Sequence, residues 1–131
     1  MRESVFVIIP VYNEAKVIRD VVKSVLRVFP NVVCVDDGSI DATAAEIAKT
    51  KAHLVKHPVN IGQGGALQTG LEYALLYPAA KYFITFDADG QHRISDAEAM
   101  VRELQKGEYD IILGSRFMMP HGVKRTCTAR T

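Results

Sequence analysis

Two aspartates, Asp87 and Asp89, come directly after an apolar run, Tyr82 to Phe86, that is typical of a buried strand. In extended chain, residues two apart point to the same side. Neighbouring carboxylates repel each other unless a cation neutralises them, and Mg²⁺ is commonly held by one or two carboxylates together with substrate phosphates. The pair therefore suits a metal–diphosphate site, although two aspartates in a glycine-containing turn are by themselves more often a solvated loop.

Three further segments carry groups that could bind a phosphorylated ligand. The turn Asp36-Asp37-Gly38-Ser39 offers carboxylates that can accept hydrogen bonds from a base N–H or a ribose hydroxyl. Residues 60–65 supply glycines ahead of a helix, where backbone can approach a ligand and the helix N-terminus attracts anions. Arg116 could pair with a phosphate through two N–H groups. Each has a plain structural alternative: a turn, a packing glycine or a solvated arginine.

Strand-like and helical patterns alternate along the chain and place these residues. Five short runs are predicted as strands: residues 5–9 and 32–35, which are expected to be buried, a weak strand at residues 53–55, and residues 82–86 and 109–113. Helical spacing of apolar residues lies between them, with Asn13 and Asp41 as suitable N-caps for the first two helices. The alternation predicts an α/β fold with a Rossmann-like, doubly wound, mostly parallel sheet.

The polar and glycine-rich residues fall almost entirely after the predicted strands. In doubly wound sheets, ligands bind beyond the carboxyl ends of the strands. Five segments are expected there: residues 10–14, 36–39, 60–65, 87–92 and 114–116. Their clustering at one edge is the strongest argument for a binding site that the residues alone provide.

Composition and charge narrow the class of protein. The 131 residues are 48% hydrophobic and 24% charged, which predicts a folded globular domain. A formal net charge of +1 gives no reason to expect a nucleic-acid partner. No stretch approaches the ~20 apolar residues that span a bilayer. The N-terminus lacks the build of a signal peptide, and Cys34 is predicted to be a small buried apolar residue, so a cytoplasmic protein is expected.

Several common sites are excluded by position. There is no G-x-x-x-x-G-K-[ST] phosphate loop and no G-x-G-x-x-G after the first strand. None of the four histidines has metal-ligand spacing with another, and only His92 lies within a candidate site, where we interpret it as a loop residue. A sugar nucleotidyltransferase would need a loop rich in glycine and arginine after the first strand, which this chain lacks.

Five motifs in register resemble one known family. They are Pro10-Val11-Tyr12-Asn13-Glu14, Val35-Asp36-Asp37-Gly38-Ser39 with Asp41 and Thr43, Asn60-Ile61-Gly62-Gln63-Gly64-Gly65-Ala66, Asp87-Ala88-Asp89-Gly90-Gln91-His92, and Gly114-Ser115-Arg116-Phe117. In this order and spacing they resemble glycosyltransferase family 2, whose members have the GT-A fold, and within it the dolichol- or polyprenyl-phosphate sugar transferases. The resemblance covers roughly residues 5 to 117.

The resemblance implies a set of nucleotide-binding residues. They are Pro10, Tyr12, Glu14, Asp36, Asp37, Gly64, Gly65 and Asp87. The first loop would contact base and ribose, and Asp36, Asp37 or both would hydrogen-bond the base. Asp87 would face the ribose or the shell of a metal ion. The donor would be a UDP-, GDP- or dTDP-linked sugar, and the motifs do not choose among the three bases.

The resemblance also implies the residues that act on the diphosphate. Asp89, within the DXD motif, would bind the Mg²⁺ or Mn²⁺ that bridges the diphosphate, with Gln91 as a second ligand, and Arg116 would lie near the diphosphate or the acceptor. Asp89 and Arg116 are therefore the predicted catalytic residues. The family transfers a sugar with inversion at the anomeric carbon, in cell-wall or polysaccharide biosynthesis, and the metal stabilises the leaving diphosphate.

Members of the family continue past the Gly-Ser-Arg motif into a segment that builds the acceptor pocket. Residues 1–117 are therefore expected to be a partial nucleotide-sugar-binding domain, truncated before that pocket, and residues 118–131 an irregular or disordered tail. The acceptor would be a lipid phosphate or a glycan, with peripheral contact at the inner membrane face as one possible location. An uncovered sheet edge favours a homo-oligomer. The alternative function is a non-catalytic nucleotide-binding or interaction module.

Overall fold

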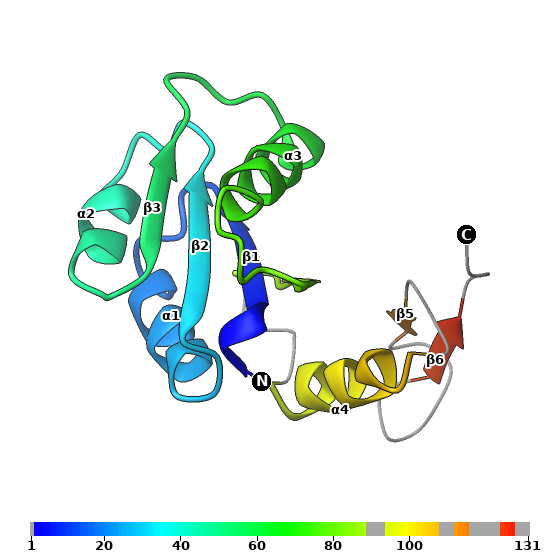
Figure 1. Ribbon diagram of the computed structural model, residues 1–131. Helices are drawn as coiled ribbons and strands as arrows, with labels where there is room; N and C mark the ends of the chain where they lie inside the picture. Colours follow the sequence, from blue (N-terminus) through cyan, green and yellow to red (C-terminus); the bar gives the residue numbers. More distant parts are fainter. Residues whose placement is uncertain (1, 89–93, 108–111, 116–123, 128–131) are drawn as a thin grey trace. The chain divides into compact units, whose positions relative to one another are not determined.

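The computed structural model describes residues 2–88, 94–107, 112–115 and 124–127, and the chain forms two compact units, residues 1–92 and 93–131 (Figure 1). The first unit is a four-stranded parallel sheet with helices on both faces, preceded by a short 3-10 turn, Arg2–Ser4. Its strands are β1 (Val5–Val11), β2 (Asn31–Asp36), β3 (His53–Lys56) and β4 (Tyr82–Thr85). Its helices are α1 (Ile18–Leu26), α2 (Thr43–Ala48) and α3 (Gln63–Ala74).

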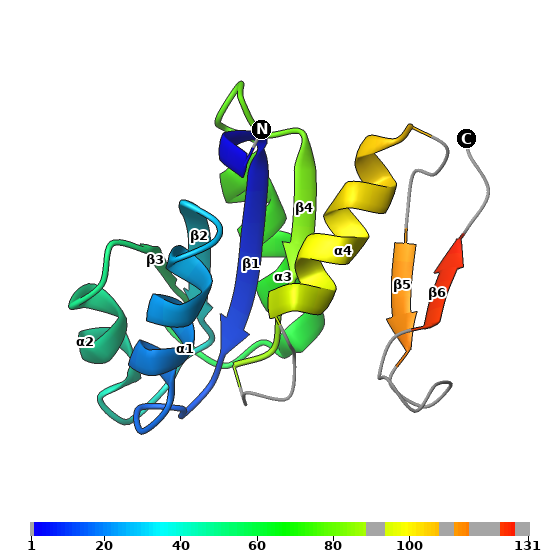
Figure 2. The same cartoon turned by 90° about the horizontal axis from the view of Figure 1, so that it is seen from below.

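The strand order is β3-β2-β1-β4, and every neighbouring pair is parallel. The chain moves outward from β1 to β2 and β3, and then returns past β1 to add β4 on the other side. The two views agree that α1 and α2 cover one face of the sheet and α3 covers the other (Figure 2). This arrangement confirms the predicted doubly wound α/β fold.

Strand β1 is the centre of the core because both of its faces are buried. Phe6 and Ile8 pack towards α3 together with Val33 and Val35 of β2. Val7 is also only 1% exposed, which explains the continuous apolar run without polar alternation. Cys34 is fully buried, and burial raises the pKa of its thiol to about 12, so it behaves as the predicted apolar residue.

Helix α3 approaches the sheet closely at Gly70. A Cβ atom at this position would lie 2.4 Å from Cγ2 of Ile8 and 3.2 Å from Cγ2 of Val35. Both neighbours are fully buried β-branched side chains whose rotamers have little freedom. Glycine at this position therefore sets the separation between α3 and the sheet.

The second unit contains α4 (Ile94–Gln105), β5 (Ile112–Ser115) and β6 (Lys124–Cys127). Strands β5 and β6 pair with each other in an antiparallel ladder, with Ile112 opposite Cys127. The sequence predicts a last strand over residues 109–113, and the structure describes a strand at Ile112–Ser115, while residues 109–111 lie outside the described residues.

The tail also differs from the prediction, because residues 124–127 form a strand inside the segment expected to be irregular. Lys-Arg-Thr-Cys has no apolar alternation, and its strand depends on backbone hydrogen bonds to β5. The chain also divides after His92, whereas the sequence suggested a boundary after residue 117. Gly114 and Ser115 belong to β5 rather than to a loop.

The close approach of α3 gives a test of the fold. Gly70→Ala should lower the free energy of unfolding by roughly 1–3 kcal/mol, because the added methyl group overpacks against Ile8. Gly64→Ala in the same helix is the control, since its Cβ would meet no atom within 4 Å. Helix propensity should make that variant neutral or more stable by up to ~1 kcal/mol. Urea denaturation measures both, and equal effects of the two substitutions would contradict the packing account.

Candidate functional site

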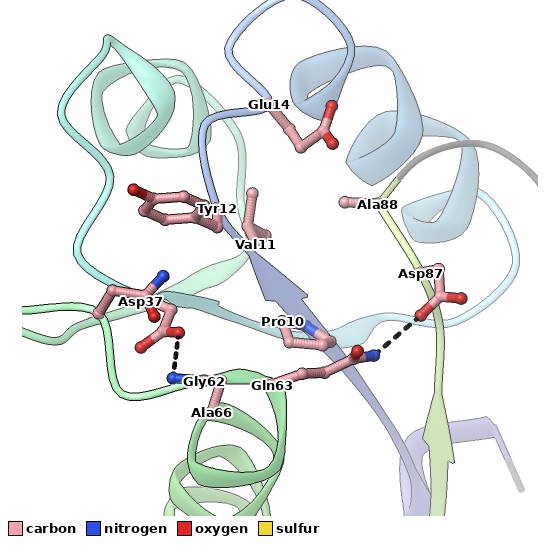
Figure 3. Close-up of a pocket in the computed structure, with 11 residues that line it drawn as sticks. Pro10, Val11, Tyr12, Glu14, Asp37, Gly62, Gln63, Ala66, Asp87 and Ala88 are labelled. Carbon is pink, nitrogen blue, oxygen red and sulfur yellow. Dashed lines mark hydrogen bonds between the residues drawn. The ribbon is translucent and has the colours of Figure 1, made fainter.

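A cleft of about 380 Å³ lies at the carboxyl ends of the strands in the first unit (Figure 3). Its position follows from the strand order. Because the chain reverses direction across the sheet between β1 and β4, the loops after these two strands diverge and leave a crevice. The cleft is lined by Pro10, Val11, Tyr12, Glu14, Asp37, Asn60, Gly62, Gln63, Ala66, Asp87 and Ala88.

Asp37 is the most highly connected side chain of the cleft. Its Oδ1 accepts hydrogen bonds from the Ile61 N–H at 3.0 Å and from His57 Nδ1 at 2.8 Å. Its Oδ2 accepts one from the Gly62 N–H at 2.9 Å. Burial raises the pKa of the Asp37 carboxyl, but the bonds from His57, Ile61 and Gly62 outweigh it, so the pKa lies below its ordinary value. Asp37 is therefore ionised near neutral pH.

The remaining hydrogen-bonding capacity of Asp37 is small and well defined. A carboxylate has about four acceptor sites, and three are filled by the contacts above. Oδ1 carries two of the bonds and Oδ2 carries one. Asp37 therefore has the capacity to accept one further strong hydrogen bond, at Oδ2.

Two glycines shape the wall beside Asp37. Gly62 has a φ of +98°, a conformation that favours glycine, and it precedes the first residue of α3. Its position brings the N-terminus of that twelve-residue helix to the cleft. Gly38 has a φ of +76°, and a Cβ there would lie 2.5 Å from the backbone of Val59 and Asn60. The turn after β2 therefore packs directly against the loop after β3.

The first loop is held in place by the segment after β2. The Asn13 N–H donates to Ser39 Oγ at 2.8 Å, and Asn13 Oδ1 accepts from the Ile40 N–H at 3.0 Å. The Glu14 N–H donates to Thr43 Oγ1 at 3.0 Å. Asn13 has a φ of +52° and does not cap a helix, because α1 begins only at Ile18. The predicted N-cap role is wrong, and Asn13 instead joins two loops at the rim of the cleft.

Tyr12 and Asp87 present different chemistry to the cleft. Tyr12 is 46% exposed, so its ring is available for stacking against a planar ligand (Figure 3). Asp87 follows β4, and its Oδ1 accepts a hydrogen bond from Gln63 Nε2 at 3.4 Å. Base-stacking and anionic groups therefore both line the cleft, with Asp87 on the side of α3.

The carboxylate oxygens of the cleft fit a divalent cation whose coordination shell is completed by phosphate oxygens of a ligand. Within the described part of the chain, no group of three His, Cys, Asp or Glu side chains is arranged to hold a metal. Glu14 and Asp87 nevertheless bring hard carboxylate oxygens to the cleft wall. Mg²⁺ and similar ions are commonly held by only one or two carboxylates plus phosphate oxygens.

The structure brings together five of the eleven sequence-predicted site residues. Pro10, Tyr12, Glu14, Asp37 and Asp87 all line the cleft. Three predicted residues do not line it: Asp36, Gly64 and Gly65. Three others, Asp89, Gln91 and Arg116, lie outside the described residues, as does His92.

The residues that do not line the cleft have other contacts. The Asp36 carboxylate is buried and its Oδ1 accepts a hydrogen bond from the Ser39 N–H at 3.0 Å, which closes the turn after β2. Gly65 lies against the side chain of Ile61, and Gly64 is exposed in the first turn of α3. Sequence reasoning named Asp36 and Asp37 together, and the structure places only Asp37 at the cleft.

The sequence analysis did not identify two polar residues that line the cleft, nor the partly buried histidine that contacts Asp37. Asn60 and Gln63 were recognised only as part of a glycine-rich loop, although both line the cleft. His57 was dismissed because it has no metal spacing, yet it contacts Asp37. The one signal available in the sequence was that polar residues lie in or just before the glycine-rich loop at residues 60–65.

Comparison with known proteins agrees with this architecture. Residues 6–126 match the family described as glycosyl transferase family 2. An uncharacterized protein of Methanocaldococcus jannaschii is 44% identical over 125 residues, covering 94% of this chain and 51% of the relative. A UDP-N-acetylglucosamine–dolichyl-phosphate N-acetylglucosaminyltransferase of Methanococcus voltae is 34% identical over 138 residues, covering 92% of this chain and 55% of the relative. The chain therefore spans about half the length of these curated relatives.

Solved structures show the same fold. Glucosyl-3-phosphoglycerate synthase from Mycobacterium tuberculosis, in complex with Mn²⁺ and UDP-glucose, superposes with a TM-score of 0.67 at 23% identity, covering 86% of this chain and 43% of that one. The parallel sheet with a cleft at its point of reversal thus has the architecture of a GT-A fold. The chain belongs to glycosyl transferase family 2. No helix among the described residues is long and apolar enough to cross a membrane.

The pKa of Asp37 predicts a pH dependence of stability. A carboxyl group whose pKa is lowered on folding stabilises the folded chain above its ordinary pKa, which is 3.8 for Asp, and this contribution is lost as the pH falls through the lower folded value. Asp37→Asn should therefore be less stable than the parent at pH 7, and the difference should shrink as the pH falls below about 4.

Urea denaturation between pH 7 and pH 2 measures this difference. Asp20→Asn, an exposed position on α1, is the control and should show only a small difference from the parent. A difference between Asp37→Asn and the parent that stays constant over the whole range would contradict a charge-based contribution of Asp37.

Proposed function

We propose that the chain is the donor-binding half of a glycosyltransferase that takes its sugar from a uridine diphosphate sugar. The observation that carries this proposal is the buried, ionised Asp37, which has one acceptor site left at the wall of the cleft. The relative from Methanococcus voltae is named for a UDP-sugar donor, which supports the same choice of base.

The single free acceptor of Asp37 distinguishes between bases. Uracil and thymine each present one ring N–H donor flanked by two carbonyl oxygens. Guanine presents an N–H and an amino group side by side, a pair that is best matched by two free carboxylate oxygens. Since Oδ1 already accepts two hydrogen bonds, Asp37 favours a base with one donor. Tyr12 would stack on the same base.

The part of the cleft formed by the start of α3 suits the diphosphate. The Gly62 N–H already donates to Asp37, but the first turn of α3, which begins at Gln63, has a dipole that favours negative charge. Asp87 and the neighbouring Asp89 would hold Mg²⁺ or Mn²⁺ with the phosphate oxygens. When bound, the metal ion neutralises the charge that develops on the leaving diphosphate.

The proposed reaction is a displacement at the anomeric carbon of the sugar. An oxygen atom of the acceptor forms the new bond from the face opposite the diphosphate, the bond to the diphosphate breaks, and the configuration inverts. We propose a lipid phosphate as the acceptor, because the relative from Methanococcus voltae is named for dolichyl phosphate. A phosphate acceptor is already anionic and needs no strong base. Arg116 would pair with the diphosphate or with this acceptor.

Nucleotide binding is the direct test. Thermal unfolding should be followed with UDP, GDP and dTDP, each with and without Mn²⁺. A ligand at 100 times its dissociation constant stabilises the folded state by roughly 2.7 kcal/mol, which is on the order of 10 °C for a chain of this size. We expect the largest shift with UDP and Mn²⁺. A larger shift with GDP would overturn the base assignment, and no shift with any nucleotide would overturn the function.

The metal site is tested by replacing Asp89. Asp89→Ala should remove the Mn²⁺-dependent part of UDP binding, because the bridging cation loses a carboxylate ligand. Asp20→Ala on the exposed side of α1 is the control and should keep that dependence. Calorimetric titration with and without Mn²⁺ gives both affinities. An unchanged metal dependence in Asp89→Ala would remove this residue from the site.

A further inference from the structure

His57 contacts the proposed base-binding carboxylate, and the proposed function assigns it no role. It directly follows β3, and its backbone N–H donates to the carbonyl oxygen of Asp36 at 2.9 Å. Its side chain is 11% exposed and does not line the cleft. His57 would therefore not touch a ligand in the cleft, and any effect on binding must act through a neighbour.

The imidazole ring joins two elements that form the cleft. Nδ1 donates to Asp37 Oδ1 at 2.8 Å, since an ionised carboxylate can only accept. Nε2 lies 2.8 Å from Thr69 Oγ1, and this hydroxyl is also 3.0 Å from the carbonyl oxygen of Gly65. The ring thus connects the carboxylate at the end of β2 to the first two turns of α3.

We propose that His57 is a positioning residue that fixes the direction of the Asp37 carboxylate and leaves only one acceptor site for the base. This inference rests on the proposed function. With His57 in place, Oδ1 accepts from two donors and Oδ2 accepts from one, so the acceptor capacity that remains is at Oδ2. Without the imidazole, Asp37 keeps only the Ile61 and Gly62 bonds, and the carboxylate can turn and offer a second acceptor. The presence of His57 would therefore raise the affinity of the cleft for a base with one donor and lower its affinity for a base with two.

His53 provides an internal comparison. It is the first residue of β3, at the other end of the strand from His57, and it is also partly buried. Its Nδ1 lies 3.0 Å from the Tyr73 hydroxyl and 3.5 Å from the Tyr77 hydroxyl. His53 does not line the cleft and has no contact with Asp37 among the described hydrogen bonds. A substitution at His53 therefore removes a second partly buried imidazole from the same part of the sheet without removing a contact to Asp37.

The experiment compares three substitutions at His57. His57→Asn keeps an N–H donor near the position of Nδ1, His57→Gln places its amide near Nε2, and His57→Leu removes both. Calorimetric titration should give UDP affinities close to the parent for Asn and weaker by on the order of tenfold for Leu, the cost of one hydrogen bond to a charged group. His57→Gln should resemble His57→Leu. A role in packing alone would favour Leu, which is larger and apolar, over Asn.

Pyrophosphate with Mn²⁺ separates the base from the diphosphate. In His57→Leu its affinity should fall much less than the UDP affinity, because the Asp37 carboxylate that His57 positions is assigned to the base and not to the diphosphate. His53→Leu should leave both affinities unchanged. In an Asp37→Ala background, His57→Leu should cause no further loss of UDP affinity. Equal UDP affinities for His57→Asn and His57→Leu, or a parallel loss of UDP and pyrophosphate binding, would overturn the positioning role.

Amide hydrogen exchange tests the same contact without a nucleotide. The N–H groups of Ile61 and Gly62 both donate to Asp37, so their exchange should be faster in His57→Leu than in His57→Asn or His53→Leu. Unchanged exchange in His57→Leu would overturn the inference even if UDP binds. If the parent binds no UDP while the exchange rates change as expected, the proposed function fails and the His57–Asp37 contact stands.

Discussion

The carboxylate of Asp37 joins segments that are far apart in the chain. It lies just beyond β2, accepts hydrogen bonds from Ile61 and Gly62 in the loop before α3, and contacts His57 after β3. Its own N–H donates to the carbonyl oxygen of Val11 at 2.8 Å, which continues the pairing of β1 with β2. Because a buried charge is costly unless it is fully hydrogen-bonded, these segments must come together for the edge of the sheet to form.

The packing of α3 sets where that edge can bind a ligand. Gly70 allows the helix to lie directly on Ile8 and Val35, and the N-terminus of the same helix reaches the cleft at Gly62. The separation between α3 and the sheet and the position of the helix N-terminus at the cleft thus depend on the packing of one helix. A change in the core beneath α3 would be transmitted to the cleft wall through a rigid element.

The sequence predicted the features that depend on local pattern. The apolar runs predicted β1 and β2, and the turn residues placed Tyr12, Asp37 and Asp87 at the correct edge. Features that depend on partners were not visible. Asp36 and Asp37 are identical in type, and only the fold shows that one closes a turn while the other faces the cleft.

Three other features could not be predicted because they depend on partners that are distant in the sequence. Asn13 is a residue type that often caps helices, but its side chain and its backbone N–H are both bonded to the turn after β2. Residues 124–127 have no strand pattern, and their pairing with β5 decides their conformation. His57 has no motif of its own, because its role depends on a carboxylate twenty residues earlier in the chain.

The contact between Gly38 and the backbone of Val59 and Asn60 has a consequence for engineering this domain. The loops after β1, β2 and β3 contact one another through Asn13, Gly38 and Asp37. A change in the length or course of one loop would therefore disturb the other two. Replacing a single loop with the corresponding loop of a relative would break contacts in its two neighbours. The three loops would have to be exchanged together with the first turn of α3.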